Sequence, residues 1–291
     1  MNTALMICDP SWSTGNIAKC LQAAIPGWSF TLFDWAQPFE EHTANGYDAV
    51  VSMSMTGAAR NETLRRPGIA HACFGPGEMD LPEVRCLVLP PGTLMAGGSS
   101  ECCRLLSAAH PGTTVLWAPG FAHPQFVRRD RTGPYLRAGF VGFPQAQNIE
   151  VSGGVKRPEM FLEICRKAYL TPVFSEKNYT FQNMQEFYDS IDVLISTSSR
   201  EGGPFGPFEA IACGVPMLST NVGLMTDVGF PGLFDTVEEA VALCAGLPRW
   251  APALKVAQST LAREHKMRAA WAWRSVLEAA TYARSDATRC A

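Results

Sequence analysis

Two glutamates flank a loop rich in glycine and proline in the second half of the chain. Glu201 and Glu209 are separated by seven residues, three of them glycines and two of them prolines. A carboxylate accepts hydrogen bonds from two neighbouring hydroxyl groups, so a pair of carboxylates suits a ligand that carries sugar rings. The alternative is that Glu201 is solvated, that Glu209 caps the start of a helix, and that the glycines only turn the chain.

The elements around this loop favour a phosphate group as part of the ligand. An apolar strand over 193–197 ends in hydroxyl residues and leads into the loop, and a helix is expected to start at Phe208 or shortly before. Glycines let a ligand approach backbone N–H groups closely, and the first turn of a helix has unpaired donors and a positive dipole end. The segment therefore predicts a site for a phosphorylated sugar.

The same segment resembles the E-x7-E signature of glycosyltransferase family 4 and its relatives of GT-B fold. Their usual form is E-G-x-G-x-P-x-x-E-A-x-A-x-G-x-P after a strand. The positions in register here are Glu201, Gly202, Glu209, Ala210, Ala212, Gly214 and Pro216, and Pro207 lies one position after the proline of the pattern. Weaker similarities, including Gly139–Gly142 as the first strand of a donor-binding domain, extend the resemblance over residues 113–235.

The resemblance implies a role for each matching residue. Glu201 would contact the hydroxyls of the transferred sugar, and Glu209 would hold the ribose diol of the nucleotide. Lys156, with Arg157, would neutralise the pyrophosphate as the leaving nucleoside diphosphate gains charge. Backbone groups of the loop would support the sugar and phosphates, namely those of Gly202, Gly203, Pro204 and Phe205.

Two positions depart from the family pattern. Phe143 stands where the family often has an arginine, so a second positive charge must come from Arg157, Arg200 or elsewhere. Only Phe205 can take the role of the loop phenylalanine, because two residues intervene after Gly202.

His71 is the second candidate for a catalytic role. It lies in an apolar run over 69–74, where related enzymes place a histidine facing the donor sugar. An imidazole there could hydrogen-bond the sugar or the acceptor. A structural histidine whose nitrogens are satisfied inside the protein is the alternative, and both interpretations stay open.

The order of elements predicts two parallel sheets, each covered by helices. Predicted strands of the first half are 4–8, 29–35, 47–53, 69–74, 86–89 and 113–117. Those of the second half are 138–141, 171–174, 193–197 and 216–220, with helices at 158–168, 183–190, 208–213, 237–247 and one or two over 254–284. With a polar linker over 128–134, we expect domains 1–127 and 132–266. The resemblance implies a GT-B fold, two Rossmann-like domains facing a cleft, whose final helix (about 267–285) crosses back to the first domain.

Composition fits this interpretation and excludes others. The 291 residues suffice for about two domains, and with 47% hydrophobic and 18% charged residues the chain can form buried cores. No apolar run reaches the ~18 residues of a membrane span, and no signal peptide is evident. The ten scattered cysteines form no C-x-x-C pair, which favours reduced thiols and a cytoplasmic location. There is no HExxH or Asp-x-Asp pattern, so we expect no metal site.

The predicted function is a retaining, metal-independent glycosyltransferase that uses a nucleotide-activated sugar. A UDP-sugar is the expected donor substrate, with no further cofactor, and the acceptor could be a glycan, a lipid, a small molecule or nucleic acid. Alternatives are a GT-B nucleotide-sugar epimerase or phosphorylase, and a non-catalytic relative that binds sugar nucleotides. The net charge of −3 disfavours binding to nucleic acid through global charge. A modified nucleic-acid base as acceptor would need a local basic patch from arginines 60, 65, 66, 128, 129 and 131, which could equally be solvated.

Overall fold

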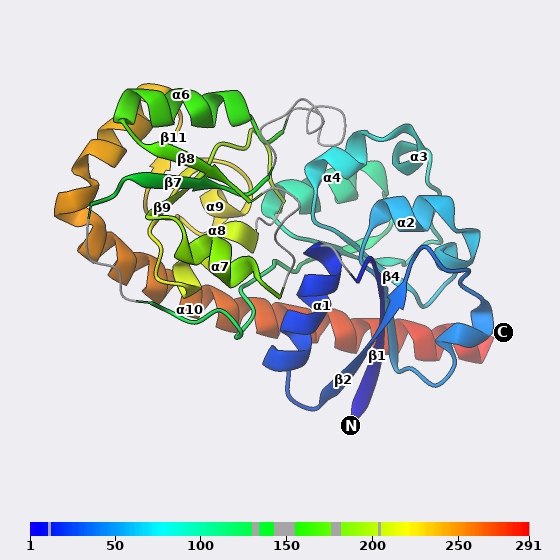
Figure 1. Ribbon diagram of the computed structural model, residues 1–291. Helices are drawn as coiled ribbons and strands as arrows, with labels where there is room; N and C mark the ends of the chain where they lie inside the picture. The colour runs from blue at the N-terminus through cyan, green and yellow to red at the C-terminus, as the bar shows by residue number, and fades with distance from the viewer. Residues whose placement is uncertain (11–12, 130–133, 143–154, 176–181, 203–204, 291) are drawn as a thin grey trace. The chain divides into compact units, whose positions relative to one another are not determined.

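The chain folds as two compact units (Figure 1). The computed structural model describes residues 1–10, 13–129, 134–142, 155–175, 182–202 and 205–290. Unit 1 comprises residues 1–123 and 267–291, and unit 2 comprises residues 124–266.

Unit 1 is built on a six-stranded parallel sheet. Its strands are β1 (Asn2–Cys8), β2 (Trp28–Asp34), β3 (Ala49–Ser52), β4 (Ala70–Cys73), β5 (Leu94–Gly97) and β6 (Thr114–Trp117). They lie side by side in the order β2-β1-β3-β4-β5-β6. The connections contain α1 (Ser13–Ala24), α2 (Met55–Arg60), α3 (Pro82–Arg85), α4 (Ser100–Ala109) and three short 3-10 helices, Glu41–Ala44, Glu62–Arg65 and Pro76–Asp80.

Unit 2 repeats this plan with five parallel strands. They are β7 (Arg137–Phe140), β8 (Thr171–Phe174), β9 (Val193–Ser196), β10 (Met217–Thr220) and β11 (Leu233–Phe234), in the order β11-β10-β9-β7-β8. The helices between them are α6 (Pro158–Ala168), α7 (Met184–Asp189), α8 (Phe205–Ala212) and α9 (Leu224–Asp227). Strand β9 is central and its Val193 and Ile195 are wholly buried, which is why it reads as a continuous apolar run. The predicted fold class, two parallel α/β sheets, is confirmed.

One long helix, α10 (Val237–Cys290), belongs to both units, with Met267 as its first residue in unit 1. Within unit 1 its Trp273 is fully buried, donates its indole N–H to the Pro119 carbonyl at 3.0 Å, and stacks on Phe74 with ring centroids 6.0 Å apart. The sequence predicts separate helices here because prolines normally interrupt a helix. The structure instead has a single helix with Pro248 and Pro252 inside it.

One predicted strand of the first half is wrong. Residues 86–89 form no strand, since α3 ends at Arg85 and the chain then runs irregularly; the sheet is completed by β5, whose four residues are buried. Helix α8 begins at Phe205, shortly before Phe208. Pro207 is compatible with this earlier start, because a proline in the first turn of a helix removes a donor that has no partner within the helix.

Candidate active site

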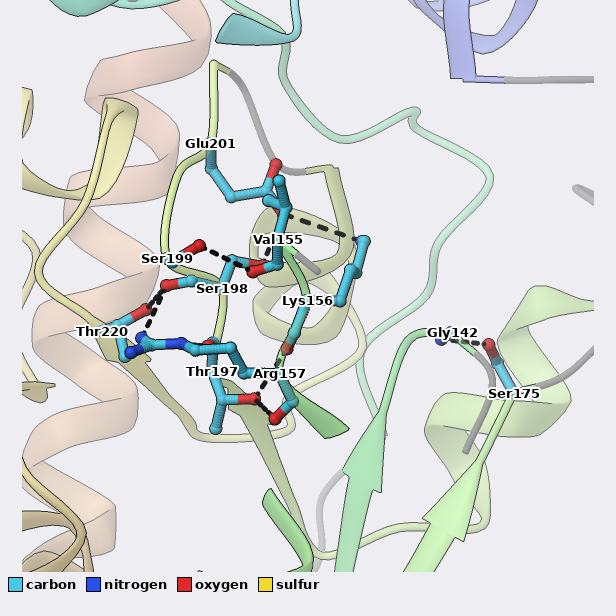
Figure 2. Close-up of polar contacts among 10 residues, drawn as sticks. All are labelled: Gly142, Val155, Lys156, Arg157, Ser175, Thr197, Ser198, Ser199, Glu201 and Thr220. Atoms are coloured by element: carbon cyan, nitrogen blue, oxygen red, sulfur yellow. Dashed lines mark hydrogen bonds and ion pairs between the residues drawn. The ribbon is translucent and has the colours of Figure 1, made fainter. Parts of the chain in front are cut away.

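The candidate site is built at the carboxyl end of β9 (Figure 2). The strand continues into Thr197 and Ser198, both buried, and then into the loop that carries Glu201. Open parallel sheets bind ligands outside the carboxyl ends of their strands, so the topology of unit 2 places this loop where a ligand is expected.

The segment that precedes α6 is tied to this loop by a group of hydrogen bonds. Arg157 donates from Nε to the Thr197 carbonyl at 2.6 Å and from Nη2 to the Ser198 carbonyl at 3.0 Å. The Thr197 hydroxyl lies 2.9 Å from the carbonyl oxygens of both Lys156 and Arg157, and the Ser199 amide donates to the Val155 carbonyl at 2.7 Å. Arg157 itself has a left-handed backbone conformation, with φ 48°. These contacts fix the backbone of Lys156 beside the β9 loop.

Lys156 and Glu201 come together as a result. The Nζ of Lys156 lies 3.7 Å from Oε1 of Glu201, and the same oxygen accepts a hydrogen bond from the Ser198 hydroxyl at 2.7 Å. The Lys156 side chain is 37% exposed and that of Glu201 17%, so both are partly accessible. A cation for phosphate and a carboxylate for hydroxyl groups are thus adjacent.

The loop after β10 contacts the loop that carries Glu201, and the loop after β7 begins on the other side of β9. Thr220 at the end of β10 donates to the Ser198 carbonyl at 2.5 Å. Gly223 has a positive φ of 51°, and a Cβ on it would overlap the carbonyl oxygen of Glu201. On the other side of β9, the Gly142 amide after β7 donates to the Ser175 hydroxyl at 3.1 Å. The Glu201 backbone is therefore supported by close packing against a glycine.

Glu209 has a different environment. It lies on α8, is 7% exposed, and accepts a hydrogen bond on Oε2 from the Tyr188 hydroxyl at 2.6 Å. Burial raises the pKa of Glu209 to about 7, and the hydrogen bond from Tyr188 opposes that rise. Among the described residues the structure brings Glu201 together with Lys156, while it pairs Glu209 with Tyr188. The sequence predicts no role for Tyr188 in this site.

Several other predicted residues have clear positions. Two guanidinium nitrogens of Arg157 donate to backbone carbonyls, so this side chain connects the segment before α6 to the loop after β9. Its predicted contact with phosphate stays a prediction. Gly202 is buried and Phe205 starts α8 half-buried. Gly203, Pro204 and the Phe143 position lie outside the described residues.

His71 belongs to unit 1, in the interior of β4. Its side chain has no exposed surface, and neither ring nitrogen has a hydrogen-bond partner among the described residues. Burial, with a smaller contribution from His110, lowers the pKa of His71 to about 4, so the ring is neutral at physiological pH. This is the environment of a core residue, although the predicted contact with a sugar remains untested.

Three of the arginines considered for a basic patch form ion pairs or hydrogen bonds with neighbouring residues. Arg60 lies 3.5 Å from a Glu83 carboxylate oxygen, and Arg129 lies 2.7 Å from one of Asp189. Arg65 donates to the carbonyls of Ala58 and Ala59. Arg131 lies outside the described residues.

Metal-binding clusters and membrane-spanning helices are both absent from the described residues. No group of three or more histidine, cysteine, aspartate and glutamate side chains in the described part of the chain is arranged to hold a metal ion. None of the described helices is long and apolar enough to cross a membrane.

Residues 155–230, which contain Lys156, Glu201 and Glu209, match the family model of glycosyl transferases group 1. This part of the chain is similar to the group 1 glycosyltransferases. The match is to the group as a whole, and membership of family 4 stays a prediction. No curated protein sequence matches the chain.

Solved structures show the fold around this domain. The sucrose-phosphate synthase of Thermosynechococcus elongatus is 13% identical, has a TM-score of 0.61, and is covered over 100% of both chains. A DNA modifying enzyme, β-glucosyltransferase, solved with and without its substrate uridine diphosphoglucose, is 12% identical with a TM-score of 0.61 over 96% of this chain and 99% of that one.

The pneumococcal O-GlcNAc transferase GtfA, in complex with UDP and GlcNAc, is 10% identical with a TM-score of 0.54. The alignment covers 79% of this chain but only 56% of GtfA, so the present chain spans about half the length of that protein. At such identities the likeness shows the fold, which is GT-B. Residues 155–230 are thus similar to group 1 glycosyltransferases, and they lie in a chain of GT-B fold.

Proposed function

We propose that this protein is a glycosyltransferase that takes a sugar from a UDP-sugar held by unit 2 and transfers it to an acceptor hydroxyl. The observation that carries the proposal is the Lys156 ammonium 3.7 Å from the Glu201 carboxylate, at the carboxyl end of β9. UDP is proposed as the nucleotide because GtfA was solved with UDP and the β-glucosyltransferase with uridine diphosphoglucose.

Each member of the pair would perform one task in the reaction. The bond between the sugar C1 and the phosphate oxygen breaks, and C1 bonds to the acceptor oxygen, whose proton passes to the departing phosphate. Lys156 would stabilise the charge that develops on the diphosphate, and such stabilisation is usually the largest contribution to the rate. Glu201 would accept hydrogen bonds from the sugar hydroxyls. Because the acceptor enters from the face that the diphosphate leaves, the anomeric configuration would be retained.

We also propose that catalysis needs no metal ion, since Lys156 supplies positive charge for the diphosphate and the sequence has no Asp-x-Asp pair. Activity in excess EDTA should equal activity in untreated buffer. Loss of turnover in EDTA that Mg²⁺ or Mn²⁺ restores would contradict this part of the proposal.

A cytoplasmic location is proposed from the thiols. The nine cysteines that the structure describes as free include seven buried ones, and none of the nine forms a disulfide. Reduced cysteines are typical of the cytosol, where disulfides are rare.

The donor can be identified with a thermal-shift panel of UDP-, GDP-, ADP- and TDP-sugars. A ligand at 100 times its Kd stabilises the folded state by about 2.7 kcal/mol, so the UDP-sugars should raise Tm by several degrees. Product analysis with the best donor should then show the sugar on an added acceptor. If no nucleotide sugar raises Tm, the proposed function is wrong; an isomerised donor without transfer would identify an epimerase instead.

A further inference from the structure

Tyr188 is a buried hydroxyl that no predicted role has used. It lies near the end of α7, its ring has no exposed surface, and it packs edge-on against the ring of Phe126 with centroids 5.8 Å apart. The first turn of α8 lies directly over its hydroxyl, because a Cβ on Gly206 would come within 3.6 Å of it. The phenol is therefore fixed in one direction by packing.

That direction is toward Glu209. The hydroxyl donates to Oε2 at 2.6 Å, a length typical of a hydrogen bond from a hydroxyl to an ionised carboxylate. Among the described residues nothing donates to Oε1, the second oxygen of this carboxylate. One oxygen of Glu209 is thus anchored and the other is left for a ligand.

We propose that Tyr188 is a positioning residue, whose hydroxyl holds Oε2 of Glu209 so that Oε1 can accept hydrogen bonds from the vicinal hydroxyls of the donor's ribose. This rests on the proposed function, in which unit 2 binds a UDP-sugar. Tyr188 touches no substrate itself. It acts by fixing the rotamer of Glu209 and by stabilising its charged form in a place where water is scarce.

The burial of Glu209 makes the hydrogen bond from Tyr188 necessary for keeping this carboxylate charged. Burial favours the protonated form of Glu209, and the hydrogen bond from Tyr188 is the contact that lowers its pKa. The other titratable group acting on this pair is the buried thiol of Cys213, and Asp189, the residue after Tyr188, is paired with Arg129 at 2.7 Å. Neither replaces the phenol as a donor to Glu209. Without Tyr188 the carboxylate would hold its proton to higher pH and accept hydroxyls less well.

The test compares Tyr188→Phe with Tyr135→Phe, a half-buried tyrosine of the same unit whose ring faces the Lys255 ammonium 5.7 Å away. UDP binding is measured by calorimetry from pH 6 to 9, with Tm as the check on folding. Removing a hydrogen bond to a charged group should weaken UDP binding at least about tenfold at pH 7 for Tyr188→Phe. Raising the pH should partly restore it, because Glu209 then ionises. Tyr135→Phe should bind UDP like the wild type.

A second ligand, 2′,3′-dideoxy-UDP, lacks both ribose hydroxyls and makes the test specific. The wild type should lose affinity for it, and Tyr188→Phe should show no further loss, because both changes break the same interaction. If Tyr188→Phe binds UDP as the wild type does while Glu209→Gln does not, the positioning role is overturned and the proposed function stands. If neither the wild type nor any variant binds UDP, the proposed function itself fails.

Discussion

The pair of Lys156 and Glu201 is the chemical centre of the candidate site. Exposed ion pairs contribute little to stability, so the pair is better explained by what its members can bind than by the folding free energy. Replacing Glu201 with Gln should lower kcat/KM by about 100-fold, because a neutral amide is a weaker acceptor for sugar hydroxyls in the transition state. The measurement is steady-state transfer from the best donor. Glu163→Gln, which removes the carboxylate next to Lys167 at 2.9 Å, is the matched control and should retain full activity.

His71 should make the folded protein sensitive to acid. Its pKa is lowered to about 4, so the unfolded chain binds a proton below about pH 6.5 that the folded chain excludes. The stabilisation is complete above pH 6.5 and is lost as the pH falls toward 4, by about 3 kcal/mol at most. His71→Met should therefore lose less Tm between pH 7 and pH 5 than the wild type does. His42→Gln, at an exposed histidine, should follow the wild type; identical curves for all three proteins would show that His71 is not responsible.

The sequence predicts which residues belong to the site better than it predicts their hydrogen-bond partners. The resemblance brings Lys156 and Glu201 into one site, and the structure places them in contact. It gives no hint of the bond between Tyr188 and Glu209, or of the bonds from Arg157 to the carbonyls of Thr197 and Ser198. Such contacts join residues 21 or more positions apart, and they depend on how helices lie on the sheet. Spacing along the chain does not encode that.

The loops after β9 and β10 act as one element, because Gly223 lies against the Glu201 backbone. Gly223→Ala should displace Glu201, since the new Cβ would overlap its carbonyl oxygen. We expect loss of donor binding together with a fall in Tm. Gly229→Ala is the control: this glycine also has a positive φ, 60°, but nothing lies within 4 Å of its Cβ position. It should cost about 1 kcal/mol in stability and leave donor binding intact; equal donor affinity in both variants would contradict the close packing at Glu201.

Elements with strong local signals were predicted well. Helix α6 has its predicted bounds, Pro158–Ala168, and β8 its predicted bounds, Thr171–Phe174. The strand predicted at 86–89 is wrong because an apolar run of four residues fits irregular chain as well as a strand, whereas β5 was missed between Pro91 and Gly98. Only the sheet, which needs a strand between β4 and β6, decides between the two runs.

At the scale of the whole molecule, α10 contributes to both units, and its last part completes unit 1. Trp273→Ala should destabilise unit 1 by about 3–5 kcal/mol, because a buried tryptophan leaves a large cavity and the Pro119 carbonyl loses its donor. Trp271, two residues earlier and 73% exposed, is the control. Chemical denaturation should show no change in stability for Trp271→Ala, and equal effects of the two substitutions would contradict the docking of α10 in unit 1.

The central claim is that unit 2 binds a nucleoside diphosphate through Lys156, and calorimetric titration with UDP tests it most directly. Lys167 is the matched control, since it is also a partly exposed lysine paired with a glutamate, at 33% exposure against 37% for Lys156. The account predicts that the wild type and Lys167→Ala bind UDP equally, and that Lys156→Ala binds at least about tenfold more weakly. Equal affinity of Lys156→Ala and the wild type for UDP would contradict it.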